Sequence, residues 1–261
     1  MKKRALIVGI NSYPPPIPTL RGCVPDAKNW CSLLIGTYGF ETPVVLLESS
    51  ATIENIRKNL TTLINASEAG DVLVWTFSGH GTSVPNLRPD KPDGRAEAIV
   101  AYDGLMYDSQ IRGMMQTIRS GVHMTVISDS CHSGTVTRLN RLEHHLFKDL
   151  PQMRYFPPQE DTLALRLSEL PVTSRAFIGE DSMVEILLSG CLATEYSNDA
   201  NINGNFVGAF SYNAIDILRN SPTMTYNNFY AQLRARLPSS LYQQTPQLEG
   251  QSVRKAQPVF S

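Results

Sequence analysis

The sequence predicts an α/β fold with a central, mostly parallel β-sheet flanked by helices. Short runs of apolar, β-branched and aromatic residues alternate along the chain with longer segments whose apolar residues recur at helical spacing, which is the pattern of β-α-β units. With 261 residues, of which 42% are hydrophobic, the chain is large enough to form a full core, either as one large domain or as two small ones.

The first half of the chain gives these elements in regular order. Residues 5–10 follow a short basic stretch, but their apolar run is too short for a signal peptide and predicts a buried strand instead. A helix is predicted to begin near Pro25, and residues 44–47 predict a second strand. Thr52 is a predicted N-cap for a second helix, which returns the chain to a strand over residues 71–77. This order indicates a right-handed, mainly parallel sheet.

The second half of the chain continues the alternation around one irregular stretch. The expected elements are a helix over 109–118, strands over 122–127 and 184–188, helices over 207–218 and 226–237, and a last strand at Val259–Phe260. Between residues 139 and 182, prolines and charged residues accumulate and no clean period survives. A long loop of this kind is usually functional or mobile.

Composition and charge exclude several classes of function. The formal net charge of −1 gives no reason to expect nucleic acid or an anionic membrane as a partner. No apolar stretch approaches the length of a transmembrane helix. The four cysteines show neither a secreted disulfide framework nor the CxxC spacing of a metal site. We therefore expect a protein of the reducing cytoplasm.

Two of the predicted strands each end by presenting one half of a Cys-His pair. His80 follows the strand over residues 71–77, and Cys131 follows the strand over 122–127. The carboxyl ends of parallel strands meet at one edge of a sheet, where ligands bind. A neighbouring imidazole makes a thiol a strong nucleophile by lowering its pKa. The pairing therefore predicts a cysteine hydrolase, in which the glycines beside both residues leave backbone N–H groups free to bind an oxyanion.

Five motifs in order along nearly the whole chain support this interpretation. They are LRGCVPDA at 20–27, SGHG at 78–81, DSCHSG at 129–134, LSGC at 188–191 and QTPQLEG at 244–250. Together they resemble the metacaspase and prokaryotic orthocaspase branch of the caspase-like cysteine peptidases. The resemblance implies a single caspase-like domain, a three-layer α/β sandwich. Residues 1–138 would form its large segment, 139–182 a flexible linker or insertion, and 183–261 its small segment.

The resemblance also implies roles for individual residues. Cys131 matches the family's nucleophile and His80 its general acid/base. The backbone amides of Gly81 and Cys131 would bind the oxyanion. The pocket for P1, the residue before the scissile bond, matches the family at four positions. They are Cys23, Asp26, Ser78 and Asp129.

The two carboxylates of this pocket predict its specificity without reference to the family. Asp26 and Asp129 held close together repel each other, and an incoming cation relieves that repulsion. A guanidinium can bind in a bidentate manner, as an ammonium cannot. We therefore predict cleavage of protein and peptide substrates after Arg, with Lys second. A preference for Asp would instead require converging arginines.

The linker that the resemblance implies, residues 139–182, carries basic residues after which a protease of this specificity could cut. The candidate self-cleavage sites are Arg141, Lys148, Arg154, Arg166 and Arg175. We therefore expect a zymogen matured by a cut within residues 139–182. An activating protease or a regulatory protein is a further expected partner.

The sequence departs from the calcium-stimulated members of the family. The acidic residues that would match their calcium loop are Asp93, Glu97, Asp103 and Asp108. Arg138 stands where we would place another acid, and a fixed cation there would repel Ca²⁺. We expect no required cofactor, and the sequence argues against calcium dependence. An acidic loop of this kind is more often solvated than metal-bound.

Three alternatives stay open at this level. The chain could be a catalytically silent caspase-like scaffold, in which Cys131 is an inert buried thiol and His80 a structural histidine. It could be a related Cys-His peptidase with another P1 preference, such as Asn, with Asp26 supporting its helix and Asp129 bonding only to backbone. A structural zinc site is the weakest alternative, because the Cys and His residues lack ligand spacing.

Overall fold

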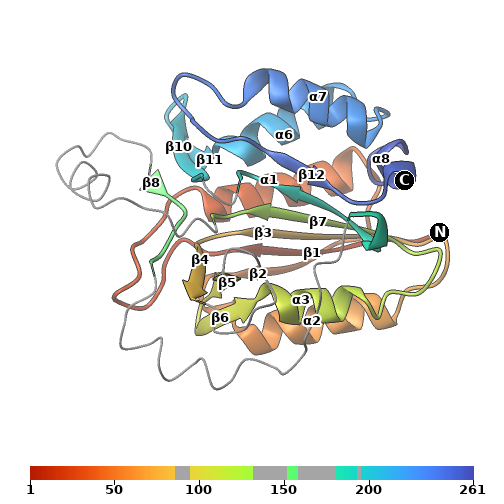
Figure 1. Ribbon diagram of the computed structural model, residues 1–261, viewed down its shortest axis with the longest axis horizontal. Coiled ribbons are helices and arrows are strands. Elements are labelled where there is room, and N and C mark those ends of the chain that lie inside the picture. The colour runs from red at the N-terminus through yellow and green to blue at the C-terminus, as the bar shows by residue number, and fades with distance from the viewer. Residues whose placement is uncertain (86–94, 132–151, 158–179, 193–194) are drawn as a thin grey trace.

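A six-stranded sheet forms the centre of the computed structural model, which describes residues 1–85, 95–131, 152–157, 180–192 and 195–261 (Figure 1). The strands, in the spatial order β12-β9-β7-β3-β1-β2, are β12 (Gln247–Glu249), β9 (Glu185–Ser189), β7 (His123–Asp129), β3 (Val72–Ser78), β1 (Lys3–Gly9) and β2 (Val44–Leu47). Every neighbouring pair is parallel except β12 and β9. The predicted α/β class, with a mostly parallel sheet, is confirmed.

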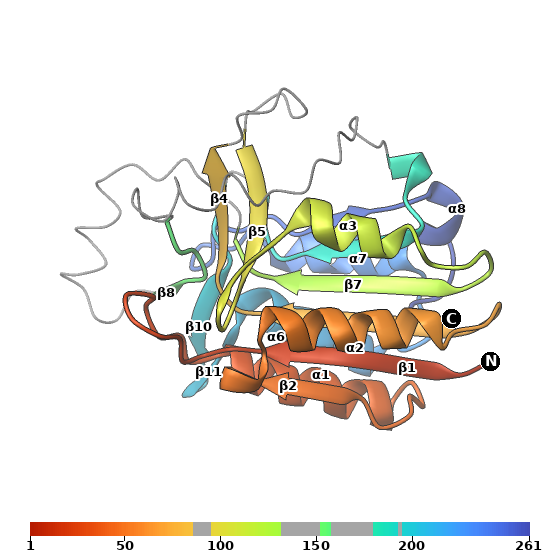
Figure 2. The same cartoon turned by 90° about the horizontal axis from the view of Figure 1, so that it is seen from below.

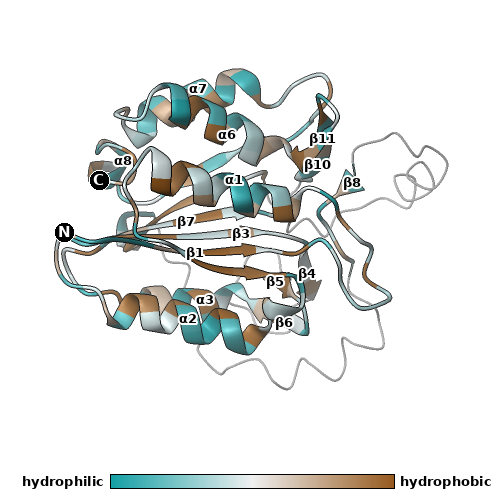
Figure 3. Ribbon diagram, turned by 180° about the vertical axis from the view of Figure 1, so that it is seen from behind, coloured by the Kyte–Doolittle hydropathy of each residue, from teal (hydrophilic) through white to brown (hydrophobic). Residues whose placement is uncertain are grey.

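Helices cover both faces of this sheet, which gives three layers (Figures 1 and 2). Helices α1 (Cys23–Gly36), α6 (Ala209–Asn220) and α7 (Tyr226–Arg236) lie on one side, and α2 (Ile53–Asn65) and α3 (Asp108–Met115) on the other. A short helix, α8 (Ser252–Lys255), follows β12. Alternate residues of each strand enter the two cores: Ile7 packs with Trp30 of α1, whereas Val8 packs with Ile56 of α2. The strands are accordingly largely apolar, while the helices also carry polar residues (Figure 3).

Two small sheets and two short 3₁₀ helices complete the described fold. One sheet is an antiparallel meander of β4 (Gly81–Pro85), β5 (Arg95–Ala101) and β6 (Gly104–Tyr107), and the other joins β8 (Gln152–Met153), β10 (Asn198–Ile202) and β11 (Asn205–Gly208). The 3₁₀ helices are Glu48–Ser50 and Glu180–Ser182. Strands β4, β8 and β10 lie at the end of the molecule opposite the two termini (Figure 1). This is the end that the carboxyl termini of β3 and β7 face.

Most of the predicted elements are found, with local differences. The Thr52 side chain caps α2 by accepting from the Asn55 amide at 3.2 Å, as predicted. Val207 belongs to β11 rather than to α6, because the chain turns at Gly208 before the helix begins. The predicted last strand at 259–260 is wrong: both side chains are buried against the α1 side of the sheet, whose edge is formed by β12. None of the described helices has the length and apolar character of a membrane span.

Candidate active site

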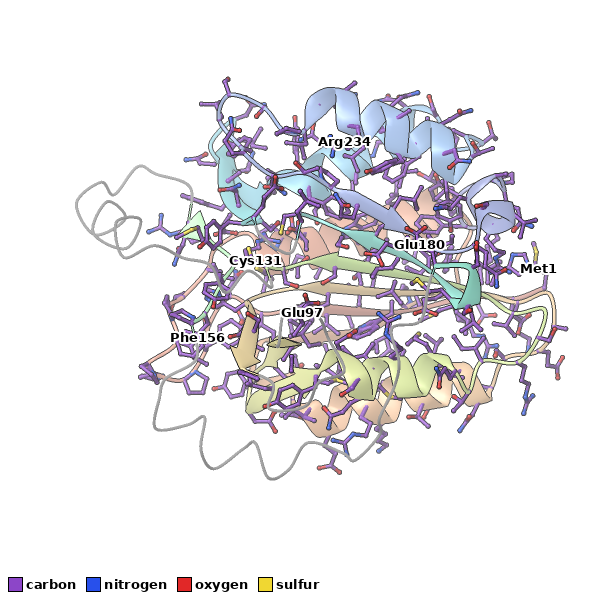
Figure 4. All side chains as sticks on the ribbon, in the orientation of Figure 1. Met1, Glu97, Cys131, Phe156, Glu180 and Arg234 are labelled. Atoms are coloured by element: carbon purple, nitrogen blue, oxygen red, sulfur yellow. The ribbon has the colours of Figure 1, made fainter. Side chains whose placement is uncertain are left out.

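The ends of β3 and β7 bring the predicted Cys-His pair to one edge of the sheet. Ser78 pairs in register with Asp129, so that His80 and Cys131 each lie two residues beyond a paired position. Both side chains are buried. In Figure 4, Cys131 lies at the end of the sheet opposite Met1. The order of the strands therefore explains how residues 51 positions apart in the sequence come to lie at the same edge of the sheet.

Hydrogen bonds define the state of the His80 ring. Its Nε2 lies 2.7 Å from the carbonyl oxygen of Pro18. Because a carbonyl can only accept, Nε2 carries the proton, and Nδ1 has no hydrogen-bond partner among the described groups. Burial lowers the pKa of His80 to about 4. The imidazole is therefore neutral at pH 7, and Nδ1 is the nitrogen available to take a proton.

Hydrogen bonds to residues elsewhere in the sequence hold both members of the pair. The Tyr13 hydroxyl accepts from the His80 amide at 3.0 Å and donates to the Val100 carbonyl at 3.1 Å. The Cys131 sulfur accepts from the Ser197 amide at 2.6 Å and lies 3.3 Å from the Ser197 carbonyl oxygen. The thiol is therefore positioned by the loop that precedes β10, a part of the chain far from it in sequence.

One backbone carbonyl oxygen of the chain accepts from both amides that the sequence predicts for an oxyanion site. The carbonyl oxygen of Arg154 accepts from the backbone amides of Gly81 at 2.9 Å and Cys131 at 3.2 Å. A β-carbon at position 81 would collide with the carbonyl group of Cys131, so this approach requires glycine. The two amides predicted from the sequence therefore converge on the same oxygen atom.

The segment around Arg154 crosses the site in an extended conformation. On one side of Arg154, β8 pairs antiparallel with β10, and the Arg154 amide donates to the Ser197 carbonyl at 3.0 Å. On the other side, the Phe156 amide donates to the Gly81 carbonyl at 3.0 Å. Backbone hydrogen bonds of this kind are how proteins hold an added peptide strand.

The side chain of Arg154 enters a buried pocket made of three carboxylates. Its Nη2 lies 2.7 Å from Asp26 and 3.0 Å from Asp199, and its Nη1 lies 3.0 Å from Asp129. Nη1 also donates to the Asp129 carbonyl oxygen at 3.2 Å. All four side chains are almost completely shielded from solvent. We call this group of residues the arginine pocket.

Fixed hydrogen bonds hold each carboxylate of the arginine pocket in place. Asp26 accepts from the Gly208 amide at 2.9 Å, and Asp199 accepts from the amides of Arg21 at 2.8 Å and Gly22 at 2.9 Å. Asp129 accepts from the amide and hydroxyl of Ser211 and from the hydroxyl of Ser197.

The carboxylates of the pocket outnumber the cation. Burial raises the pKa of Asp26 to about 7, although Arg154 opposes that shift, and nearby Asp129 adds to it. The neighbouring carboxylates raise the pKa of Arg154 well above its usual value despite its burial. An excess of buried negative charge requires a cationic partner.

The other residues predicted for the P1 pocket lie nearby without bonding to the guanidinium. Cys23 begins α1 and Ser78 ends β3, and both are buried. Among the described contacts, neither side chain forms a hydrogen bond to Arg154. Asp199 does so, yet sequence reasoning missed it. The one signal that could have found it is an acid that follows the LSGC motif by eight residues.

The remaining predicted residues divide between described and undescribed parts of the chain. Of the self-cleavage candidates, only Arg154 is described, and Arg141, Lys148, Arg166 and Arg175 lie outside the described residues. The same is true of Asp93 and Arg138. Asp103 accepts from the Ile53 amide at the start of α2, and Asp108 lies 3.8 Å from Arg112. Where the chain is described, no three acidic, His or Cys side chains gather as a metal site.

A second group of carboxylates lies on the α3 side of the sheet. They line a cavity of about 220 Å³ beside Arg112 of α3, together with Trp75 and Cys191. The carboxylates are Glu97, Asp108, Glu185 and Glu249. We call this region the acidic cavity. Burial raises the pKa of both Glu185 and Glu249, and Arg112 opposes the shift.

Comparison with known proteins identifies relatives over the whole chain. Residues 3–140 match the family model described as metacaspase, peptidase C14 domain. Metacaspase-1A of Aspergillus fumigatus is 30% identical over 95% of this chain and 68% of its own length. Metacaspase-4 of Arabidopsis thaliana is 43% identical over 51% of this chain, but the match spans only 34% of that protein.

Solved structures show the same fold. Protein GSU0716 from Geobacter sulfurreducens matches with a TM-score of 0.78 and 25% identity, covering 100% of this chain and 99% of that one. Caspase-1 from Spodoptera frugiperda matches with a TM-score of 0.61 and 12% identity over 96% of this chain and 86% of the other. The second likeness concerns the fold alone.

Proposed function

Because this chain belongs to the metacaspase family of C14 peptidases, we propose that it is a cysteine endopeptidase that cleaves after Arg, with Lys second. Membership in the family assigns a cysteine-type peptidase domain. The observation that supports the proposed specificity is Arg154: its guanidinium is held by three buried carboxylates while its carbonyl accepts from the amides of Gly81 and Cys131. One residue thus has its side chain in a cation pocket and its carbonyl in an oxyanion site.

The proposed reaction follows from the groups around this carbonyl. The Cys131 sulfur bonds to the carbonyl carbon of the P1 residue, and His80 takes the thiol proton at Nδ1. Negative charge that develops on the oxygen is stabilised by the two backbone amides. The C–N bond then breaks as His80 returns the proton to the leaving amine. Water hydrolyses the thioester, which releases the P1 carboxylate and restores the thiol.

The arginine pocket favours Arg over Lys by its geometry. The two terminal nitrogens of the guanidinium reach different carboxylates: Nη1 bonds to Asp129, and Nη2 bonds to Asp26 and Asp199. A lysine ammonium is a single point charge, so it cannot contact all three acids in this arrangement. Lysine would therefore be accepted more weakly, because the charge is satisfied but one carboxylate is left without its partner.

The same contacts support a specific site of maturation. Arg154 is the self-cleavage candidate that belongs to the described part of the predicted linker, and it lies in the pocket. The bond that follows its carbonyl is Arg154–Tyr155. We include in the proposal that the chain cuts itself at this bond. Before the cut, Arg154 blocks the site against other substrates, so that cutting regulates activity.

Hydrolysis of matched peptides tests the specificity. Peptides with Arg, Lys, Asn or Asp at P1 are compared on wild type and Cys131→Ala, with calcium and then with a chelator. We expect cleavage after Arg, weaker cleavage after Lys, and none by the variant. Cleavage after Asn or Asp would overturn the pocket assignment and leave the Cys-His pair intact. If no peptide is cleaved even after the 152–157 segment has been cut, the chain is a scaffold. Arg cleavage that persists in chelator would support calcium independence.

Fragment mapping tests the maturation. Purified wild type should give a C-terminal fragment that begins at Tyr155, and Cys131→Ala should remain one band. Arg154→Ala should lose this cut, whereas Arg166→Ala, which removes another basic residue of the predicted linker, should keep it. A wild type that stays intact while it hydrolyses Arg peptides would contradict the maturation step alone.

A further inference from the structure

We propose that this site also selects the residue after the scissile bond, P1′, and prefers an aromatic side chain there. The inference rests on the proposed function and extends it to the other side of the cleaved bond. Its basis is the environment of Tyr155, the residue that follows Arg154. Tyr155 is only 8% exposed, and it packs in a small cluster with Cys131, Cys191 and Tyr196.

This cluster is separate from the cores that hold the fold together. The two main cores lie on either face of the sheet and contain none of its four residues. Tyr155 therefore fills a space lined by the nucleophile and by two residues of the loop before β10. The ring of Tyr155 lies 6.0 Å from the ring of Tyr196 at an interplanar angle of 57°, within the range of favourable aromatic pairs.

Hydrogen bonds fix the loop that carries Cys191 and Tyr196, which form one wall of this space. Glu195 accepts from the Thr245 hydroxyl at 2.8 Å and also from the Thr245 amide. The Cys191 sulfur lies 3.6 Å from the Glu195 carbonyl oxygen and 3.7 Å from that of Ser130. A preformed wall selects its ligand better than a flexible one, because less order is lost on binding.

The backbone on both sides of the scissile bond directs the P1′ side chain into this space. The Arg154 amide bonds to Ser197, and the Phe156 amide bonds to the Gly81 carbonyl. Tyr155 itself pairs with Gly81 as an isolated parallel bridge. Because the residues before and after it are held in this way, the P1′ side chain cannot leave the space beside Cys131 unless a backbone hydrogen bond breaks. Phe156 lies partly buried beside the core on the α3 side, so that the next position adds apolar contact.

A series of internally quenched peptides tests this inference. All peptides carry Arg at P1, and P1′ is Tyr, Phe, Leu, Gly or Asp. We expect kcat/KM to be highest for Tyr and Phe and about 10- to 100-fold lower for Gly and Asp, as is usual when an apolar pocket is left empty or receives a charge. Equal rates across the series, within about twofold, would overturn the inference.

Substitution of Tyr196 tests whether this residue causes the aromatic preference at P1′. Tyr196→Ala should lower the ratio of kcat/KM for the Tyr and Phe peptides to that for the Gly peptide toward one, while Tyr196→Phe should keep the wild-type order. An unchanged order in Tyr196→Ala would show that Tyr196 is not the wall and would overturn this assignment. Cleavage of the Gly peptide by both variants reports that they are folded. Failure of every Arg peptide would overturn the proposed function and the inference together.

Discussion

Two regions of this molecule gather carboxylates around a single arginine, and the arginines have different origins. In the arginine pocket the cation is Arg154, which belongs to a segment that crosses the site from outside the central sheet. In the acidic cavity the cation is Arg112, which belongs to α3 and lies 3.8 Å from Asp108 on the same helix. The pocket is closed around its arginine, whereas the side chains of Arg112 and Asp108 remain 27% and 32% exposed.

The difference explains why, of these two regions, the arginine pocket fits the proposed recognition of a substrate cation. Its carboxylates are completely desolvated and held by backbone and hydroxyl donors, so the loss of the cation leaves charge uncompensated. In the acidic cavity, water can screen the partly exposed pair of Asp108 and Arg112, and Arg112 cannot leave its helix. Under the proposed function, similar groups of residues therefore form an exchangeable cation site in one place and an electrostatic support in the other.

The largest expected effect comes from filling the arginine pocket. A β-carbon at position 208 would overlap the Asp129 carboxylate and lie 2.6 Å from the Arg154 guanidinium and 2.8 Å from Asp26. Gly208→Ala should therefore lower kcat/KM for Arg peptides by about 100-fold or more. The matched control is Gly113→Ala in α3, where a β-carbon would meet nothing within 4 Å. It should keep full activity, and equal losses in both variants would refute the assignment of the pocket.

The next effect separates Arg from Lys recognition. Asp199 contacts Nη2 and orders the turn before α1 through the amides of Arg21 and Gly22. Asp199→Asn should lower kcat/KM for Arg peptides by about 10-fold or more and for Lys peptides by less, because an ammonium does not need the third acid. Asp216→Asn removes a comparable but exposed carboxylate that pairs with Arg236, and it should change neither rate. An equal loss for Arg and Lys would make Asp199 purely structural.

The fold could be predicted where the periodicity is long and regular. The strand-helix alternation over the first 78 residues, with Thr52 as a cap, is present as expected. Short polar strands were missed: the β10 sequence NDANI has only two apolar residues, too few to predict a strand. The apolar pair at 259–260 resembled a strand, yet both residues are buried without strand pairing, and the ring of Phe260 packs against Tyr38 and Phe40. Tertiary contacts decide such short segments.

The site could be predicted as far as its residues lie in compact motifs. Asp26 of α1 and Asp129 at the end of β7 belong to motifs, and both carboxylates contact the guanidinium of Arg154. Asp199 was missed because it lies outside these motifs and its position depends on bonds to residues almost 180 positions earlier. Arg154 was one of five equivalent basic residues in the sequence. Arg154 reaches the pocket because the two-residue strand β8 pairs with β10. No local sequence pattern predicts that pairing.

A smaller expected effect is the pH dependence of arginine binding to the arginine pocket. The pKa of Asp26 is about 7 with a guanidinium bound, and Arg154 lowers it, so it must be higher in the empty pocket. Binding of arginine then releases a proton from Asp26. The affinity of the pocket for an Arg peptide should therefore rise by up to about tenfold per pH unit above pH 7 and be constant below pH 7. Calorimetry of an Arg peptide binding to the double variant Cys131→Ala, Arg154→Ala, in buffers of different ionisation enthalpy, measures this proton. Adding Asp26→Asn should abolish the dependence, and its persistence would assign the proton to another group.

The smallest effect concerns the stability contributed by the acidic cavity. Burial raises the folded-state pKa of Glu185 above its ordinary 4.5, so its ionisation at neutral pH destabilises the folded protein. Glu185→Gln should therefore raise the melting temperature by about 1–2 °C at pH 7, and the gain should vanish below pH 4.5, where the carboxyl group is protonated in both states. Arg112→Ala should lower the melting temperature at pH 7, because Arg112 offsets this cost. Neither variant should alter hydrolysis of Arg peptides, and a loss of activity in Arg112→Ala would show that the acidic cavity communicates with the arginine pocket after all.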